Sequence, residues 1–133
     1  MVVMLRVSKL VLVGAMAMAF LTPAIAASAK AGDVIRRGSC SGPSDWKLKL
    51  SPENGRIEVQ FEVDSNVVGQ TWRVRLFHNG TQFFSGLRTT TAPSGSFEVR
   101  RVVNNLAGDD HLKGRARNLK TDELCVGRAT FTA

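Results

Sequence analysis

Regular alternation of apolar and polar residues is the feature that most constrains this chain. Residues 56–63 read RIEVQFEV, so four apolar side chains lie on one side of an extended segment and four polar side chains on the other. A strand has a side-chain period of two residues and a helix a period of 3.6, so this pattern predicts a half-buried β-strand. The same alternation is present in residues 45–50, 71–77, 96–99 and 111–116.

Turn residues separate these segments at short intervals. SPENG at residues 51–55 and HNGT at residues 78–81 combine Pro, Asn and Gly, which punctuate β-structure. Seven or eight short strands with turns every 8–12 residues predict either an antiparallel β-sandwich or a small barrel. Because the strands are half-buried and the length suits one immunoglobulin-sized unit, we predict an all-β, antiparallel, immunoglobulin-like β-sandwich.

The first 29 residues have the pattern of a secretory signal peptide. Arg6 and Lys9 precede the apolar run LVLVGAMAMAFL at residues 10–21, and small residues follow, so cleavage after Ala26 or Ala29 is expected. The alternative is a membrane anchor, but the run is shorter than the roughly 20 residues that a span needs. We therefore expect a secreted chain with no membrane insertion after signal removal, and a single domain over residues 30–133.

Two cysteines, Cys40 and Cys125, lie near the two ends of the expected domain. In an exported protein a widely spaced pair favours a disulfide bond, and the alternative is two buried free thiols. The spacing excludes a CxxC redox motif, and two Cys with two scattered His make a poor zinc set. We expect the bond and predict neither a metal nor a cofactor.

Three segments resemble the C, C′, F and G strands of immunoglobulin-like and fibronectin type III-like domains. They are WRVRL at residues 72–76, the HNG turn at residues 78–80, and ARNLKTDELCVG at residues 116–127. The chain has no Tyr, so the tyrosine corner of that family is missing, and its cysteines do not join the two sheets at strands B and F. The whole chain also resembles small secreted proteins of actinobacteria, which implies a bacterial source and no particular activity.

The dipeptide Asn79-Gly80 predicts a tight hairpin, because a type I′ turn needs positive φ at both central positions. A two-residue loop pairs Leu76 with Phe83 and Arg75 with Phe84, and paired residues share a face. We therefore predict that Phe83 points into the core and Phe84 points outward beside Arg75.

The resemblance places strand F beside strand C, which creates a basic and aromatic surface on one sheet face. Such a composition suits recognition of an anionic polymer of the cell envelope, a nucleic acid or an acidic protein. The alternative is a solvated strand face whose arginines shield two phenylalanines. The predicted binding residues are Arg73, Arg75, Phe77, Phe84, Lys113, Arg115 and Arg117.

Catalysis is not expected. His78 lies in a predicted turn, and residues 109–111 (Asp-Asp-His) are predicted to form a solvated loop, so no catalytic residue is assigned. We predict a monomeric binding or structural module. The rival function is inhibition of a secreted enzyme by loops at one end of the sandwich, with residues 64–70 and 104–110 as the candidate loops.

Overall fold

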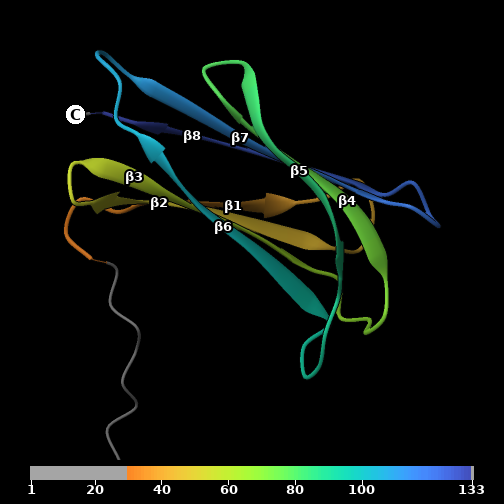
Figure 1. Cartoon of the computed structure of the whole chain (residues 1–133). Helices are drawn as coiled ribbons and strands as arrows, with labels where there is room; N and C mark the ends of the chain where they lie inside the picture. The colour runs from red at the N-terminus through yellow and green to blue at the C-terminus, as the bar shows by residue number, and fades with distance from the viewer. Residues whose placement is uncertain (1–29, 133) are drawn as a thin grey trace, which may run out of the picture.

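A computed structural model describes residues 30–132 of the chain, and it is a two-sheet antiparallel sandwich (Figure 1). The predicted signal peptide lies outside the described residues. Within them, no helix is long and apolar enough to cross a membrane. The first sheet has the order β1 (Val34–Ser39), β2 (Asp45–Glu53), β3 (Arg56–Asp64), β6 (Ser96–Asn104), and the second has the order β5 (Thr81–Thr89), β4 (Thr71–His78), β7 (Asp110–Asn118), β8 (Leu124–Phe131).

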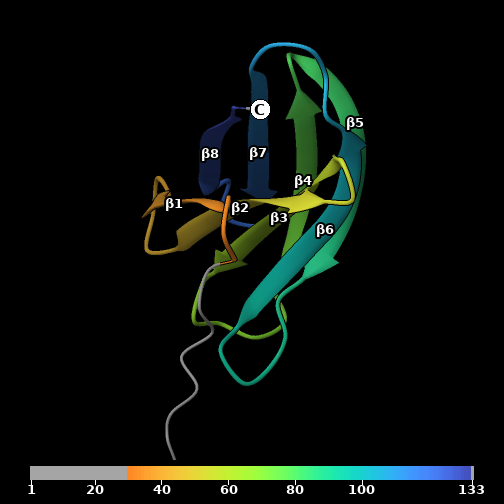
Figure 2. The ribbon, with the colours of Figure 1, turned by 90° about the vertical axis from the view of Figure 1, so that its left-hand side faces the viewer.

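The strand order confirms the all-β sandwich predicted from the alternation. The second sheet runs β5-β4-β7-β8, which is the C′–C–F–G order expected from the resemblance. Figure 2 shows the strands of this sheet running across those of the first sheet. Strand β4 is central and pairs with β5 on one side and β7 on the other, so its outward side chains lie in the middle of one sheet face.

The core lies between the two sheets and is built from the apolar rows of the alternating segments. Trp72 is fully buried, with its ring centroid 6.2 Å from that of Phe97 in the opposite sheet. A Cβ at Gly114 would lie 2.6 Å from the Phe61 ring, so the glycine in β7 makes room for this phenylalanine. The other large, fully buried apolar side chains are Leu48, Leu50, Ile57, Val59, Val63, Val74, Leu76, Val99 and Leu112.

The predicted disulfide between Cys40 and Cys125 is present, and it joins the two sheets along one side. Cys40 follows β1 and Cys125 lies in β8, and these are edge strands of different sheets, with 4.3 Å between the two Cα atoms. Glu123, the residue before β8, ties the segment after Cys40 to that strand, because its carboxylate accepts hydrogen bonds from both the backbone amide and the hydroxyl of Ser44 at 2.8 Å. The bond therefore closes the edge of the sandwich that lies beside β8.

The predicted hairpin register is correct at the turn and wrong beyond it. His78 pairs with Thr81 and Phe77 with Gln82, but a β-bulge then shifts the register, and Leu76 pairs with Phe84. A shift of one residue exchanges the two faces of a strand. Phe84 consequently packs against the core, together with the bulged Phe83, whereas Leu87 is 49% exposed on the outer face.

Two arginines cover Phe84 where β5 and β6 approach each other. The guanidinium of Arg101 on β6 lies 4.4 Å from the Phe84 ring centroid, and that of Arg88 lies 5.1 Å away. Phe84 was expected beside Arg75, but the cations that lie over its ring are those of Arg88 and Arg101. The arginines cover apolar surface at this open edge while their charges stay at the rim.

The two candidate inhibitory loops lie at opposite ends of the sandwich, which corrects the expectation that they share one end. Residue 64 ends β3 opposite Ser96, whereas residue 104 ends β6 opposite Arg56 at the far end of the same strand pair. Asp110 is a second correction, because it starts β7 and is fully buried instead of lying in a solvated loop.

Candidate anion-binding face

Six cationic side chains occupy the outward face of the second sheet, and we call this surface the basic face. Buried and outward residues alternate in β4 and β7, because Trp72, Val74 and Leu76, and likewise Leu112, Gly114 and Ala116, take the inward positions. The outward positions between them carry the charges. The basic face comprises Arg73, Arg75, Lys113, Arg115, Arg117 and, on β8, Arg128.

Four of these arginines form two pairs directly across the β4–β7 ladder. Arg73 is the partner of Arg117, and Arg75 is the partner of Arg115. The four side chains alone line a surface hollow of about 250 Å³. Like charges directly opposite each other in a sheet destabilise it, so the arrangement is unfavourable without an anion between the two strands.

The described residues supply little counter-charge to the basic face. Arg117 Nη1 lies 3.5 Å from Asp122 Oδ1, which is in the turn before β8, and this is the one ion pair that the six cations form within residues 30–132. A surface pair of this kind contributes little, because both side chains are largely hydrated. Arg73, Arg75 and Arg115 thus present guanidinium groups to solvent or to a ligand.

The outward face of the first sheet is balanced in charge, by contrast. Lys47 Nζ lies 3.8 Å from Glu62 Oε2, and Arg100 donates a hydrogen bond to Glu58. That bond holds the pKa of Glu58 below its ordinary value of 4.5, outweighing burial, which acts in the opposite direction. The excess of positive charge is therefore concentrated on one sheet and is not spread evenly over the molecule.

Phe77 and Lys113 continue the two arginine pairs toward the β4–β5 turn. They are cross-strand partners, and the Lys113 ammonium lies 4.4 Å from the Phe77 ring centroid. A second hollow of about 270 Å³ opens beside them, and its lining includes Leu112 and Ala129. Arg128 also lines it and lies opposite Lys113 on β8. This end of the basic face combines two cations with an apolar depression.

Six of the seven predicted binding residues lie together on this face, and one does not. Arg73, Arg75 and Phe77 share it with the three predicted β7 residues, whereas Phe84 lies on the core side of β5. The sequence reasoning missed Arg128 because the last strand has small or mixed residues in both of its rows. The pairing of Lys113 with Arg128 settles the facing of that strand.

His78 and Asp110 form a buried pair at the end of the same sheet. His78 Nε2 lies 2.5 Å from Asp110 Oδ1, which also accepts a hydrogen bond from the Leu106 backbone amide. The Asp110 side chain is fully buried, and the His78 ring packs edge-on against Phe83. The pair ties the loop before β7 to the end of β4, which is a structural role. His111 instead lies on the exposed side, with Nδ1 3.1 Å from the Thr130 hydroxyl.

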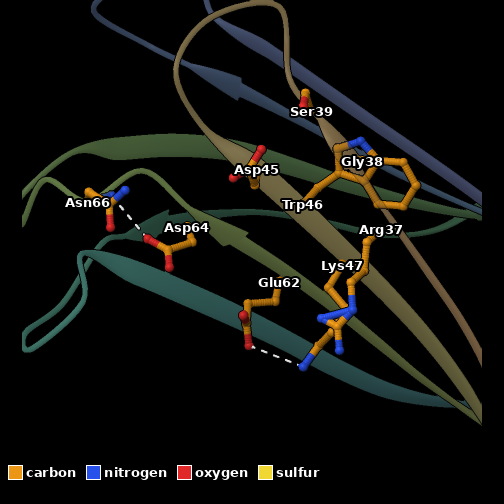
Figure 3. A pocket seen from close by; sticks show the side chains of 9 residues that line it. All are labelled: Arg37, Gly38, Ser39, Asp45, Trp46, Lys47, Glu62, Asp64 and Asn66. Atoms are coloured by element: carbon orange, nitrogen blue, oxygen red, sulfur yellow. Dashed lines mark hydrogen bonds and ion pairs between the residues drawn. The ribbon is translucent and has the colours of Figure 1, made fainter.

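A third hollow, of about 440 Å³, lies on the first sheet, where β1 and β3 end and β2 begins (Figure 3). Its charges are mixed, and the indole of Trp46 packs closely against the backbone of Gly38 and of Gly127, where an added Cβ would lie 2.6 Å from the ring. Because both glycines meet the ring, Trp46 serves to pack β2 against β1 and β8. The lining residues are Arg37, Gly38, Ser39, Asp45, Trp46, Lys47, Glu62, Asp64 and Asn66.

Comparison with known proteins gives one solved structure and no family. No family model matches the chain, and no curated protein matches it. A structure titled "Crystal structure of Br derivative BhCBM56", a carbohydrate-binding module, superposes with a TM-score of 0.40 and 21% identity, over 72% of this chain and 100% of that chain. The fold described above rests on the strand order and not on this similarity. The resemblance to actinobacterial proteins stays a prediction.

Proposed function

We propose that the protein is an exported binding module that recognises an anionic polymer or an acidic partner through its basic face. The observation that carries this proposal is the double pair Arg73–Arg117 and Arg75–Arg115, which lines a hollow with no carboxylate in its lining. An anion bound there relieves the repulsion across the ladder and pairs with guanidinium groups, whose planar forks suit oxyanions.

The disulfide and the excess of positive charge support the same proposal. Disulfide bonds persist in oxidising compartments, so the Cys40–Cys125 bond agrees with export guided by the predicted signal peptide. Removal of residues 1–29 takes away Arg6 and Lys9 and leaves 16 basic against 11 acidic residues, a formal charge of +5. A positive surface raises the local concentration of anionic partners and speeds association at low salt.

Salt-dependent retention on an anionic matrix tests the proposal. Mature protein, residues 30–133, is applied to phosphocellulose and eluted with a salt gradient, because each neutralised anion contributes to the salt dependence. The Arg75→Gln/Arg115→Gln variant is expected to elute at clearly lower salt than the unmodified protein. The matched control is Arg36→Gln/Arg37→Gln, which removes two charges from exposed positions in β1. Equal elution of the two variants would contradict recognition by the basic face.

A second candidate, inhibition of a secreted enzyme, is favoured by one loop at the end of the sandwich. Residues 65–70 are tied to Thr90, whose hydroxyl donates to the Val67 carbonyl at 2.5 Å and whose carbonyl accepts from the Gly69 amide at 2.8 Å. The held loop exposes Val67 and Val68 to 50% and 58%. Such an inhibitor is expected to lose potency against a secreted hydrolase on Val67→Ser/Val68→Ser substitution. The absence of inhibition across a panel of secreted hydrolases would dismiss this candidate.

A further inference from the structure

We infer that the basic face binds a linear polyol phosphate chain, in which three carbons separate successive phosphodiester groups, and that successive arginine pairs hold successive phosphates. This inference rests on the proposed function, because it presupposes that the face binds an anion. It adds the chemistry of the charged group, the spacing of the charges and the direction of the chain, which runs along β4 and β7.

The placement of the arginines on both sides of one hollow favours a charge carried within the chain. Arg75 reaches the hollow from β4 and Arg115 reaches it from β7. A phosphodiester has two unesterified oxygens that project to opposite sides of its own backbone, so each oxygen meets one guanidinium. A carboxylate hangs from one side of a polymer, and its planar oxygens match the fork of a single arginine.

The spacing of the pairs matches a repeat of six covalent bonds. Arg73–Arg117 and Arg75–Arg115 are two residues apart along both strands, which corresponds to about 6.8 Å of strand rise. Two residues contain six backbone bonds, and six bonds also join successive phosphorus atoms when three carbons link the phosphates. An extended chain of either kind covers about 7 Å in six bonds. Phosphates and arginine pairs therefore stay in step.

The next outward position along β7 adds two cations beside the two arginine pairs and bears on whether the polymer carries bases. Lys113 is two residues from Arg115; its β4 partner is Phe77, and its β8 partner Arg128 provides a second cation on the other side of β7. The hollow beside them, which Phe77, Lys113 and Arg128 also line, offers space for the carbon part of a repeat. Phe77 is the only phenylalanine or tryptophan that residues 30–132 place on this face, and Lys113 covers its ring. Successive bases need successive aromatic platforms, so a chain without bases fits better than a single-stranded nucleic acid.

Four synthetic probes with six negative charges each separate these possibilities by calorimetric titration of the mature protein in 50 mM NaCl. They are glycerol phosphate joined through three carbons, the same number of phosphates joined by hexane-1,6-diol, oligodeoxythymidylate and oligoglutamate. The glycerol phosphate probe is expected to bind at least tenfold more tightly than the six-carbon and glutamate probes. Equal affinity for all four overturns the inference and leaves the proposed function standing, whereas no binding to any probe overturns both.

Two further comparisons test the choice of a polymer without bases and the role of the arginine pairs. Tighter binding of oligodeoxythymidylate than of glycerol phosphate overturns the choice of a chain without bases. Arg75→Gln is expected to weaken glycerol phosphate binding about tenfold and to reduce the preference over the six-carbon probe. The control Arg37→Gln lies on the first sheet and should change neither quantity. A preference that survives in the Arg75 variant overturns the role of the arginine pairs, provided that circular dichroism shows both variants folded.

Discussion

Arg75 and Arg115 are cross-strand partners at the centre of the second sheet, and both side chains line the same hollow with two further arginines. The chain thus keeps two like charges where a cross-strand pair ordinarily contributes stability. The ligand-free protein bears an electrostatic cost at the surface that we assign to binding. Removal of that cost by substitution, by salt or by a ligand should be measurable as a gain in stability.

Arg115→Gln should raise the free energy of unfolding of the ligand-free protein by about 0.2–1 kcal/mol at low salt. The gain should shrink at 0.3 M NaCl, because the Debye length falls from about 30 Å at 10 mM salt to less than about 10 Å, and the repulsion between exposed charges weakens with it. Urea denaturation at 10 mM and 300 mM NaCl measures both effects. Arg37→Gln is the control, and a gain in that variant as large as in Arg115→Gln would point to a general charge effect.

Replacement of both cysteines by serine should lower the free energy of unfolding by about 4–5 kcal/mol on the chain-entropy estimate. The bond closes a loop with a sequence separation of 85 residues and joins edge strands of different sheets, so the unfolded chain gains much freedom without it. Guanidinium denaturation of the Cys40→Ser/Cys125→Ser variant gives the value. The reduced unmodified protein should behave like the variant, and a loss below about 1 kcal/mol would show that native packing alone holds the two edges together.

Phe84→Ala should destabilise the protein by about 1.5–3 kcal/mol, because this side chain packs against the core beneath two guanidinium groups. Leu87→Ala is expected to change stability by no more than about 0.5 kcal/mol, because Leu87 is exposed on the outer face. Thermal or urea unfolding of the two variants compares them directly. In a regular hairpin without a bulge, Leu87 would face the core and Phe84 would face outward, so Leu87→Ala would cause the larger loss of stability. Which of the two variants loses more stability therefore tests the bulge.

Stability should fall as the pH drops through the range in which Glu58 becomes protonated. The hydrogen bond from Arg100 lowers the pKa of Glu58 in the folded state, so its contribution is full above the ordinary value of 4.5 and is lost as the pH falls through the lower folded-state pKa. Urea midpoints between pH 2.5 and 6 should fall less steeply for Glu58→Gln than for the unmodified protein. Glu98→Gln removes an exposed carboxylate from the same sheet and serves as the control. Parallel curves for the unmodified protein and Glu58→Gln would contradict the assignment.

The period-two pattern was sufficient to predict β2, β3, β4, β6 and β7, together with most of the basic face. Side chains two residues apart share a face, so Arg73 and Arg75 were assigned together, as were the β7 cations. The prediction that the two sets of cations lie side by side rested on one further assumption, that strands C and F of the resemblance are neighbours. The strand order agrees, because β4 and β7 are adjacent in the second sheet.

The errors arose where more than one local arrangement satisfied the same pattern. Phe83 and Phe84 are equivalent as apolar partners for Leu76, so alternation alone does not indicate which one forms the bulge. Asp110 was predicted to lie in a solvated loop, because a charged side chain is ordinarily exposed. Its burial depends on His78 and on the Leu106 amide, and both contacts are formed only in the folded chain.

The bulge at Phe83 has a practical consequence for the comparison of related chains. Because of the one extra residue at the bulge, every later side chain of β5 lies on the opposite face from the one that a regular hairpin would give it. A sequence alignment that places the gap elsewhere in this hairpin would assign Phe84 to the side of the basic face and Leu87 to the core. The length of the segment between Phe77 and Leu87 is therefore a better guide to a shared basic face than the identity of its residues.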